Sequence, residues 1–211
     1  PPASAAMAES RLRAGGPGRL VYSYEDMRAE EMLSGALPDV LAAHAARGGR
    51  IRLALILRDP HNLFASRIRK WPDRFAGSAG IAAQAALYRG HLALARAGVA
   101  GEGGLPVTTV LYDRFVRSGE VRAELAGRLG LRPGPGRLER VPVYGHGSSF
   151  DGTGLAGPAL GDRVLGRWRA MSGDPRLAEV LAQDGLMAEA EAVFGPLPRA
   201  VEGPGCAGDG P

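Results

Sequence analysis

The residues best suited to chemistry come directly after a short apolar run. Residues 51–57 are rich in Leu and Ile, and Arg58, Asp59 and Pro60 follow them at once. Ser66 comes seven residues after Asp59, about two turns of an α-helix, so the two residues share a face if a helix begins here. An always-charged guanidinium group, a helix N-terminus and a hydroxyl group on one side form a seat suited to a phosphate group.

Three local patterns predict how these residues are positioned. The apolar run 51–57 predicts a strand that is buried on both faces, as in a parallel sheet. Asp59 predicts a helix N-cap, and Pro60 suits the first helical position because its missing N–H would have no partner there. A helix is therefore expected over residues 60–70. Arg58 then lies at the carboxyl end of the strand, where open α/β sheets bind their ligands.

The remaining patterns predict an α/β domain. Residues 19–24 and 107–112 read as two more strands, because they are rich in β-branched and aromatic side chains. A helix between the strands at 19–24 and 51–57 would make a βαβ unit with parallel strands and a right-handed crossover. Helices are expected at residues 27–47, 78–97, 118–129, 160–171 and 174–194, with Leu165 and Trp168 packing back onto the domain.

We expect one folded domain flanked by disordered ends. Residues 1–18 are rich in Ala, Gly and Pro and are expected to be disordered, the domain covers 19–194, and 195–211 form a disordered tail. No apolar run approaches the roughly 20 residues that cross a bilayer, and the N-terminus lacks the apolar core of a signal peptide. These features predict a cytoplasmic protein without a membrane span.

Composition narrows the classes of ligand. The single Cys206 cannot form an internal disulfide, and the four His residues are scattered without metal-ligand spacing, so we expect no metal. The net charge of +4 favours an anionic ligand without choosing one. Arginines are spread along the chain and aromatic residues are sparse, which argues against nucleic acid as a partner. The composition does not specify an oligomeric state.

The pattern RDPxxxxxS after an apolar strand resembles the 3′-phosphate-binding segment of sulfotransferases that use 3′-phosphoadenosine 5′-phosphosulfate. In that family the Arg and the Ser hold the 3′-phosphate, and they fall here on Arg58 and Ser66. The resemblance covers residues 19–194. It implies the phosphosulfate nucleotide as co-substrate and an α/β three-layer sandwich with a parallel sheet, related to P-loop NTPases.

Two further segments resemble this family. The run VLYDRFVRSGEVRAELAGRLGL, residues 110–131, resembles a family segment in which a strand leads into a helix ending in Leu-Gly-Leu. We interpret this unit as structural, forming the edge of the sheet. The Gly-rich run at 141–154 resembles a GSSFDG-like run of bacterial sulfotransferases that closes over the nucleotide. By analogy, Gly147, Ser148 and Ser149 would donate hydrogen bonds to a phosphate; a flexible surface loop also accounts for this run.

The resemblance also implies a catalytic base and a second phosphate-binding loop. Sulfuryl transfer needs a base for the acceptor's proton, and Glu25 follows a predicted strand as such bases do in the family. Glu25 equally fits an acid at a helix N-terminus, where the helix dipole favours it. The family's PKSGTTW-like loop, which cradles the 5′-phosphosulfate, has no counterpart in this sequence, and Met7 is its first methionine. An N-terminally truncated sequence is the simplest explanation.

Two functions follow from these observations. The first is sulfuryl transfer from 3′-phosphoadenosine 5′-phosphosulfate to the hydroxyl or amine of a small-molecule or carbohydrate acceptor. The second is a catalytically inactive nucleotide-binding remnant or fragment of such an enzyme, because the sulfate-side loop is missing.

Overall fold

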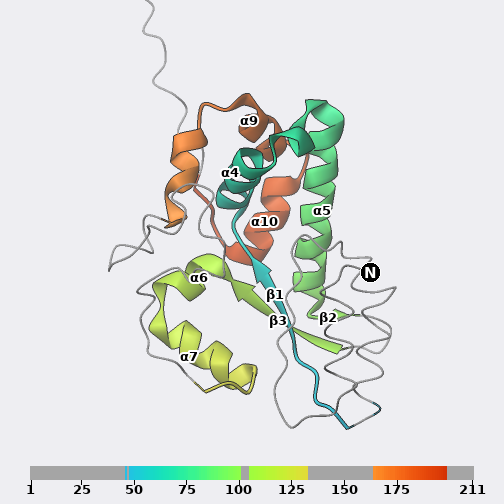
Figure 1. Ribbon diagram of the computed structural model, residues 1–211, viewed down its shortest axis with the longest axis vertical. Coiled ribbons are helices and arrows are strands. Elements are labelled where there is room, and N and C mark those ends of the chain that lie inside the picture. Colours follow the sequence, from blue (N-terminus) through green and yellow to red (C-terminus); the bar gives the residue numbers. More distant parts are fainter. Residues whose placement is uncertain (1–45, 47, 101–104, 133–163, 199–211) are drawn as a thin grey trace, which may run out of the picture.

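The computed structural model describes residues 46, 48–100, 105–132 and 164–198 (Figure 1). The strand expected at 19–24, most of the helix expected at 27–47 and the Gly-rich run at 141–154 lie outside these residues. The described part is a mixed α/β fold that is mostly helical and contains a small sheet. None of the described helices combines the length and apolar character that crossing a membrane requires.

The sheet contains a parallel pair, as expected for a parallel sheet, but residues 19–24, the predicted partner of 51–57, lie outside the described residues. Strand β1 (Leu53–Leu57) pairs in parallel with β3 (Leu105–Leu111), so that Leu57 lies opposite Leu111. The two-residue strand β2 (Val99–Ala100) pairs antiparallel with β3, and the order is β1-β3-β2. The prediction that β3 forms the sheet edge is therefore wrong. The chain leaves a long helix at Gly98 and passes directly along the outer side of β3, where Val107 N–H donates to the Gly98 carbonyl at 2.9 Å.

Helices predicted from caps and apolar periodicity lie where expected. Helix α4 (Pro60–Lys70) begins after Asp59, whose side chain accepts a hydrogen bond from the Asn62 backbone N–H at 3.1 Å. Helix α5 (Gly77–Ala97) follows a short 3₁₀ helix, η1 (Pro72–Phe75), and helix α7 (Gly119–Arg128) is capped by Ser118. Helix α6 (Tyr112–Arg117) was not expected and follows β3 without a loop.

The C-terminal helices differ from the prediction. The single helix expected at 174–194 is wrong, because the chain forms α9 (Pro175–Leu181) and α10 (Leu186–Phe194). Gly185 separates them with φ of 75°, a left-handed conformation that an α-helix cannot contain. The end of the segment expected to be helical at 160–171 is the 3₁₀ helix η3 (Arg167–Met171). Leu165 and Trp168 are buried, as predicted.

The core lies between the sheet and the helices α4, α5, α9 and α10, which gather at the carboxyl end of β1 (Figure 1). Phe64 of α4 contacts Phe75 and Tyr88 edge-on, with ring centroids 6.3 and 5.5 Å apart, and all three side chains are fully buried. Edge-to-face pairs of this kind stabilise a core beyond their buried area. The core therefore fixes α4 on α5, and with it the start of α4 at the end of β1.

Strand β1 is not buried on both faces, contrary to the prediction. Leu55 and Leu57 point into the core, whereas Ile56 is 64% exposed and Ala54 is also exposed. Successive side chains of a strand point to opposite faces. In the described part of the molecule, the helices that touch β1 cover one of these faces.

Candidate functional site

A small cavity lies at the carboxyl end of the two parallel strands, and it brings together both residues predicted to hold a phosphate. Arg58 enters it from the end of β1, and Ser66 enters it from the second turn of α4. Its other walls come from distant parts of the chain. Among the described residues, the lining consists of Arg58, Asn62, Ser66, Tyr112, Val164, Leu165 and Arg167.

The Arg58 side chain and backbone are each held by an aromatic residue. The guanidinium carbon lies 4.4 Å from the centre of the Tyr112 ring, a cation–π contact that orients the charged group. The Tyr88 hydroxyl donates a 2.8 Å hydrogen bond to the Arg58 carbonyl. Arg58 is therefore positioned by the helix behind the strand and by the neighbouring strand end.

The sequence analysis interpreted the unit that contains Tyr112 as structural and did not predict that Tyr112 lines the cavity. The sequence carried a signal for it: Tyr112 follows a strand at the same point at which Arg58 follows another. Because Leu57 and Leu111 lie opposite each other in the parallel pair, the next residues of both strands emerge side by side. The ends of adjacent parallel strands commonly contribute jointly to a binding site.

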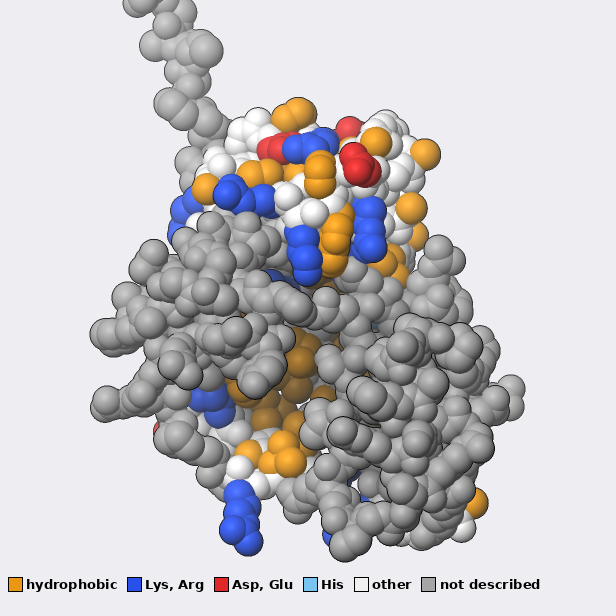
Figure 2. Space-filling view, viewed as in Figure 1, with side chains coloured by type: hydrophobic (Ala, Val, Ile, Leu, Met, Phe, Trp, Pro, Cys, Tyr) orange, Lys and Arg blue, Asp and Glu red, His pale blue; other side chains and the backbone are white. Residues whose placement is uncertain are grey.

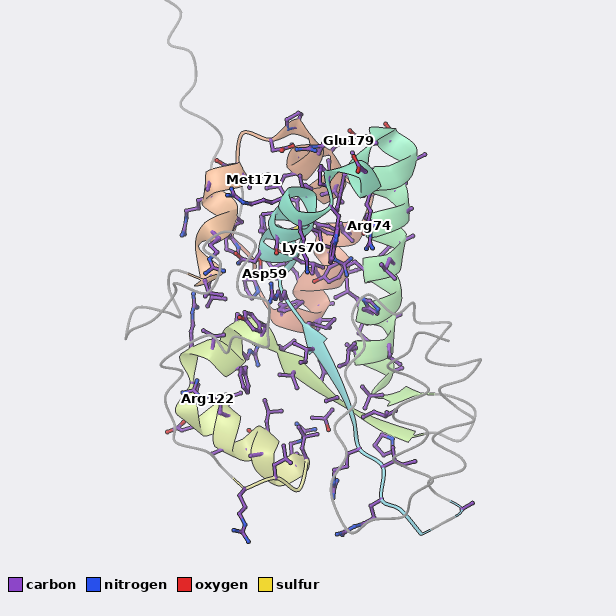
Figure 3. All side chains as sticks on the ribbon, in the orientation of Figure 1. Asp59, Lys70, Arg74, Arg122, Met171 and Glu179 are labelled. Carbon is purple, nitrogen blue, oxygen red and sulfur yellow. The ribbon has the colours of Figure 1, made fainter. Side chains whose placement is uncertain are left out.

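Asn62 connects the start of α4 to the segment 164–167, which lines another side of the cavity. Its side-chain amide donates to Asp59 Oδ2 and to the Leu165 carbonyl, both at 2.8 Å. Three residues after Arg58, the buried ring of His61 packs against Trp168 with ring centroids 4.8 Å apart. These two contacts attach the residues on either side of Arg167 to the first turn of α4. Figure 3 labels Asp59 at the start of this helix.

The electrostatic character of the cavity is positive. Burial acts to raise the pKa of Asp59, but the nearby His61 ring and the hydrogen bonds from Asn62 outweigh it and hold this pKa below its ordinary value of 3.8. The Asp59 carboxylate thus accepts hydrogen bonds from Asn62 in the helix that it caps, and it does not line the cavity. Burial, together with the nearby charge of Asp59, raises the pKa of Tyr88, which stays a neutral donor. The described lining contains two guanidinium groups and no carboxylate.

The cavity is small. Its volume is about 20 Å³, which is room for about one water-sized group. Val164, Leu165 and Arg167 form one wall, and a phosphate group could enter only if this wall or its side chains turned outward. Arginine has a long stem with several rotatable bonds, so its side chain has other rotamers to which it can turn.

The remaining charges of this face are dispersed. In Figure 2 the Lys and Arg side chains of the described part are separated by apolar and neutral groups and do not form one stripe. Lys70 and Arg74 stack on Trp71 at 4.5 and 4.4 Å, and they belong to the far end of α4 and to η1. This pattern fits a local anion site better than an extended polyanion track.

The other predicted site residues, Glu25, Gly147, Ser148 and Ser149, lie outside the described residues, so their roles stay predictions. Comparisons with known protein families, with curated proteins and with solved structures found no match to this chain.

Proposed function

We propose that this chain binds 3′-phosphoadenosine 5′-phosphosulfate and belongs to a sulfotransferase-like enzyme. One observation carries the proposal: Arg58 and Ser66, which fall on the phosphate ligands of the RDPxxxxxS pattern, line one cavity at the carboxyl end of a parallel strand. The 3′-phosphate of the nucleotide would occupy this cavity after its wall has turned outward. The guanidinium group of Arg58 and the Ser66 hydroxyl would supply charge-assisted and neutral hydrogen bonds.

The reaction is sulfuryl transfer by in-line displacement. An oxygen or nitrogen of the acceptor forms a bond to sulfur, and the bond between sulfur and the bridging oxygen of the nucleotide breaks. The bridging electron pair leaves with adenosine 3′,5′-bisphosphate, and the acceptor proton passes to a base, for which Glu25 is our candidate. Gly147, Ser148 and Ser149 would add donors to the phosphate. The parallel pair β1–β3 fits a larger parallel sheet of the P-loop type.

A nucleotide-binding protein without transferase activity is the second candidate. The observation that favours it is the absence from the 211 residues of any run resembling PKSGTTW, the loop that would hold the 5′-phosphosulfate. Both candidates share the Arg58 site, so a binding experiment tests what they have in common and a turnover experiment separates them.

Calorimetric titration with adenosine 3′,5′-bisphosphate, with AMP as control, tests the shared site. We expect the protein to prefer the bisphosphate. Arg58→Ala should weaken bisphosphate binding by roughly tenfold to a hundredfold, the value of a hydrogen bond to a charged group. Arg50→Ala removes the same charge from an exposed position just before β1 and should change little. Equal affinity for both nucleotides, or equal effects of the two substitutions, would rule out the assignment.

Turnover separates the two candidates. We expect the enzyme to release adenosine 3′,5′-bisphosphate from the phosphosulfate nucleotide when a hydroxyl or amine acceptor is present. Glu25→Gln should abolish this release and leave bisphosphate affinity unchanged. Tight binding without release under any acceptor would favour the inactive nucleotide-binding protein instead.

A further inference from the structure

We propose that Arg167 is a second guanidinium ligand of the anion held by Arg58, and that the pair selects a dianionic phosphate monoester. The inference rests on the proposed function, because it concerns the same cavity. Arg167 lies 109 positions after Arg58 and belongs to η3, and no local pattern in the sequence connects the two. The fold nevertheless brings both side chains to one small cavity together with Ser66.

The charges of the lining support a doubly charged ligand. Two guanidinium groups that face one cavity repel each other, and an anion between them replaces this repulsion with two attractions. No carboxylate is part of the described lining, and Asp59, the acid that precedes α4, is engaged by Asn62 and lies near His61. A phosphate monoester carries nearly two negative charges at neutral pH, whereas a diester carries one. Guanidinium groups also bind phosphate oxygens in pairs.

The backbone around Arg167 is fixed while its side chain can turn. Leu165 accepts the 2.8 Å hydrogen bond from Asn62, and Trp168 packs on His61, so the backbone on either side of Arg167 is tied to the start of α4. The Arg167 side chain forms part of the wall that must turn to admit a phosphate group. After turning, its guanidinium group would meet the anion from the side opposite Arg58.

The test compares Arg167→Gln with Arg169→Gln. Both substitutions remove one positive charge from η3, but Arg169 is exposed, lies 5.4 Å from the Trp168 ring and does not line the cavity. We expect Arg167→Gln to weaken binding of adenosine 3′,5′-bisphosphate by roughly tenfold to a hundredfold, and Arg169→Gln by less than about threefold. Arg167→Lys, which keeps the charge but loses the paired geometry, should bind with intermediate affinity.

Selectivity provides a readout that a purely structural role would not change. The wild-type protein should prefer adenosine 3′-phosphate to its methyl diester, and Arg167→Gln should lose most of this preference while unfolding in urea as the wild type does.

Equal bisphosphate affinity for Arg167→Gln and Arg169→Gln, alongside weakened binding by Arg58→Ala, would overturn this inference and leave the proposed function standing. Absence of bisphosphate binding by the wild-type protein would overturn both.

Discussion

Helix α4 has eleven residues, and its two faces have different roles. On one face, Phe64 and Ile68 are one turn apart and fully buried among the aromatic residues of η1 and α5. On the other, Asn62 and Ser66 are also one turn apart and line a positively charged cavity. The first face therefore makes apolar contacts, and the second makes polar ones.

The two faces of α4 also differ in their partners. The apolar face meets η1 and α5, which follow α4 directly in the sequence, and α4 also packs on α9, which comes much later in the chain. The polar face meets Tyr112 and residues 164–167, which arrive from two distant segments. The apolar face therefore belongs to the main core of the domain, whereas the cavity depends on the few residues that line it. Stability and binding should accordingly respond to different substitutions on this one helix.

The largest expected effect is on the apolar face. Phe64→Ala removes a fully buried ring with two edge-to-face partners and should lower the free energy of unfolding by about 3–5 kcal/mol. Ser66 lies two residues further on, on the polar face. Ser66→Ala should lower the free energy of unfolding by no more than about 1 kcal/mol but should weaken bisphosphate binding. Urea unfolding followed by circular dichroism measures both. Similar losses of stability in the two variants would show that the two faces are not separable.

A smaller effect is expected where α5 approaches η1. A methyl group at Gly80 would lie 2.8 Å from the Arg74 carbonyl oxygen, so the backbone must shift to accept it. Gly80→Ala should therefore destabilise the protein by about 1–3 kcal/mol, the usual cost of overpacking.

Gly127 in α7 is the matched control for this substitution. A methyl group there would have no neighbour within 4 Å, so Gly127→Ala should stabilise the protein by roughly 0.5–1 kcal/mol through helix propensity. Thermal unfolding of the two variants should give shifts of opposite sign. A stabilising effect of Gly80→Ala would mean that the contact between α5 and η1 is looser than described.

Features set by neighbouring residues could be predicted from the sequence. Asp59 and Pro60 predicted the start of α4, and apolar spacing predicted the buried face of α5 and a helix at 118–129, which corresponds to α7. Each depends on hydrogen bonds or contacts within a few residues. The parallel pairing of β1 and β3 was also predictable, because a helical segment between two strands requires a crossover.

Features set by distant contacts could not be predicted in the same way. Tyr112 and Arg167 reach the Arg58 cavity only through the pairing of β1 with β3 and the packing of η3 on α4. The break at Gly185 was missed because the apolar pattern continues on both sides of it. The exposure of Ile56 depends on which elements cover the sheet, which the composition of a single strand does not reveal.

A similarly small effect is expected at Asp59, the residue where both faces of α4 begin. The pKa of this carboxyl is lower in the folded protein than its ordinary value of 3.8, so the ionised form stabilises the fold. This stabilisation is present above the ordinary value and is lost as the pH falls through the lower, folded-state pKa.

Asp59→Asn keeps a good N-cap but cannot titrate. The wild type should therefore exceed the variant in free energy of unfolding by about 1 kcal/mol at neutral pH, and this margin should shrink as the solution is acidified. Urea unfolding of both proteins between about pH 7 and about pH 3 measures the margin. A margin that stays constant across this range would show that the contacts of Asp59 with Asn62 and His61 do not depend on its charge.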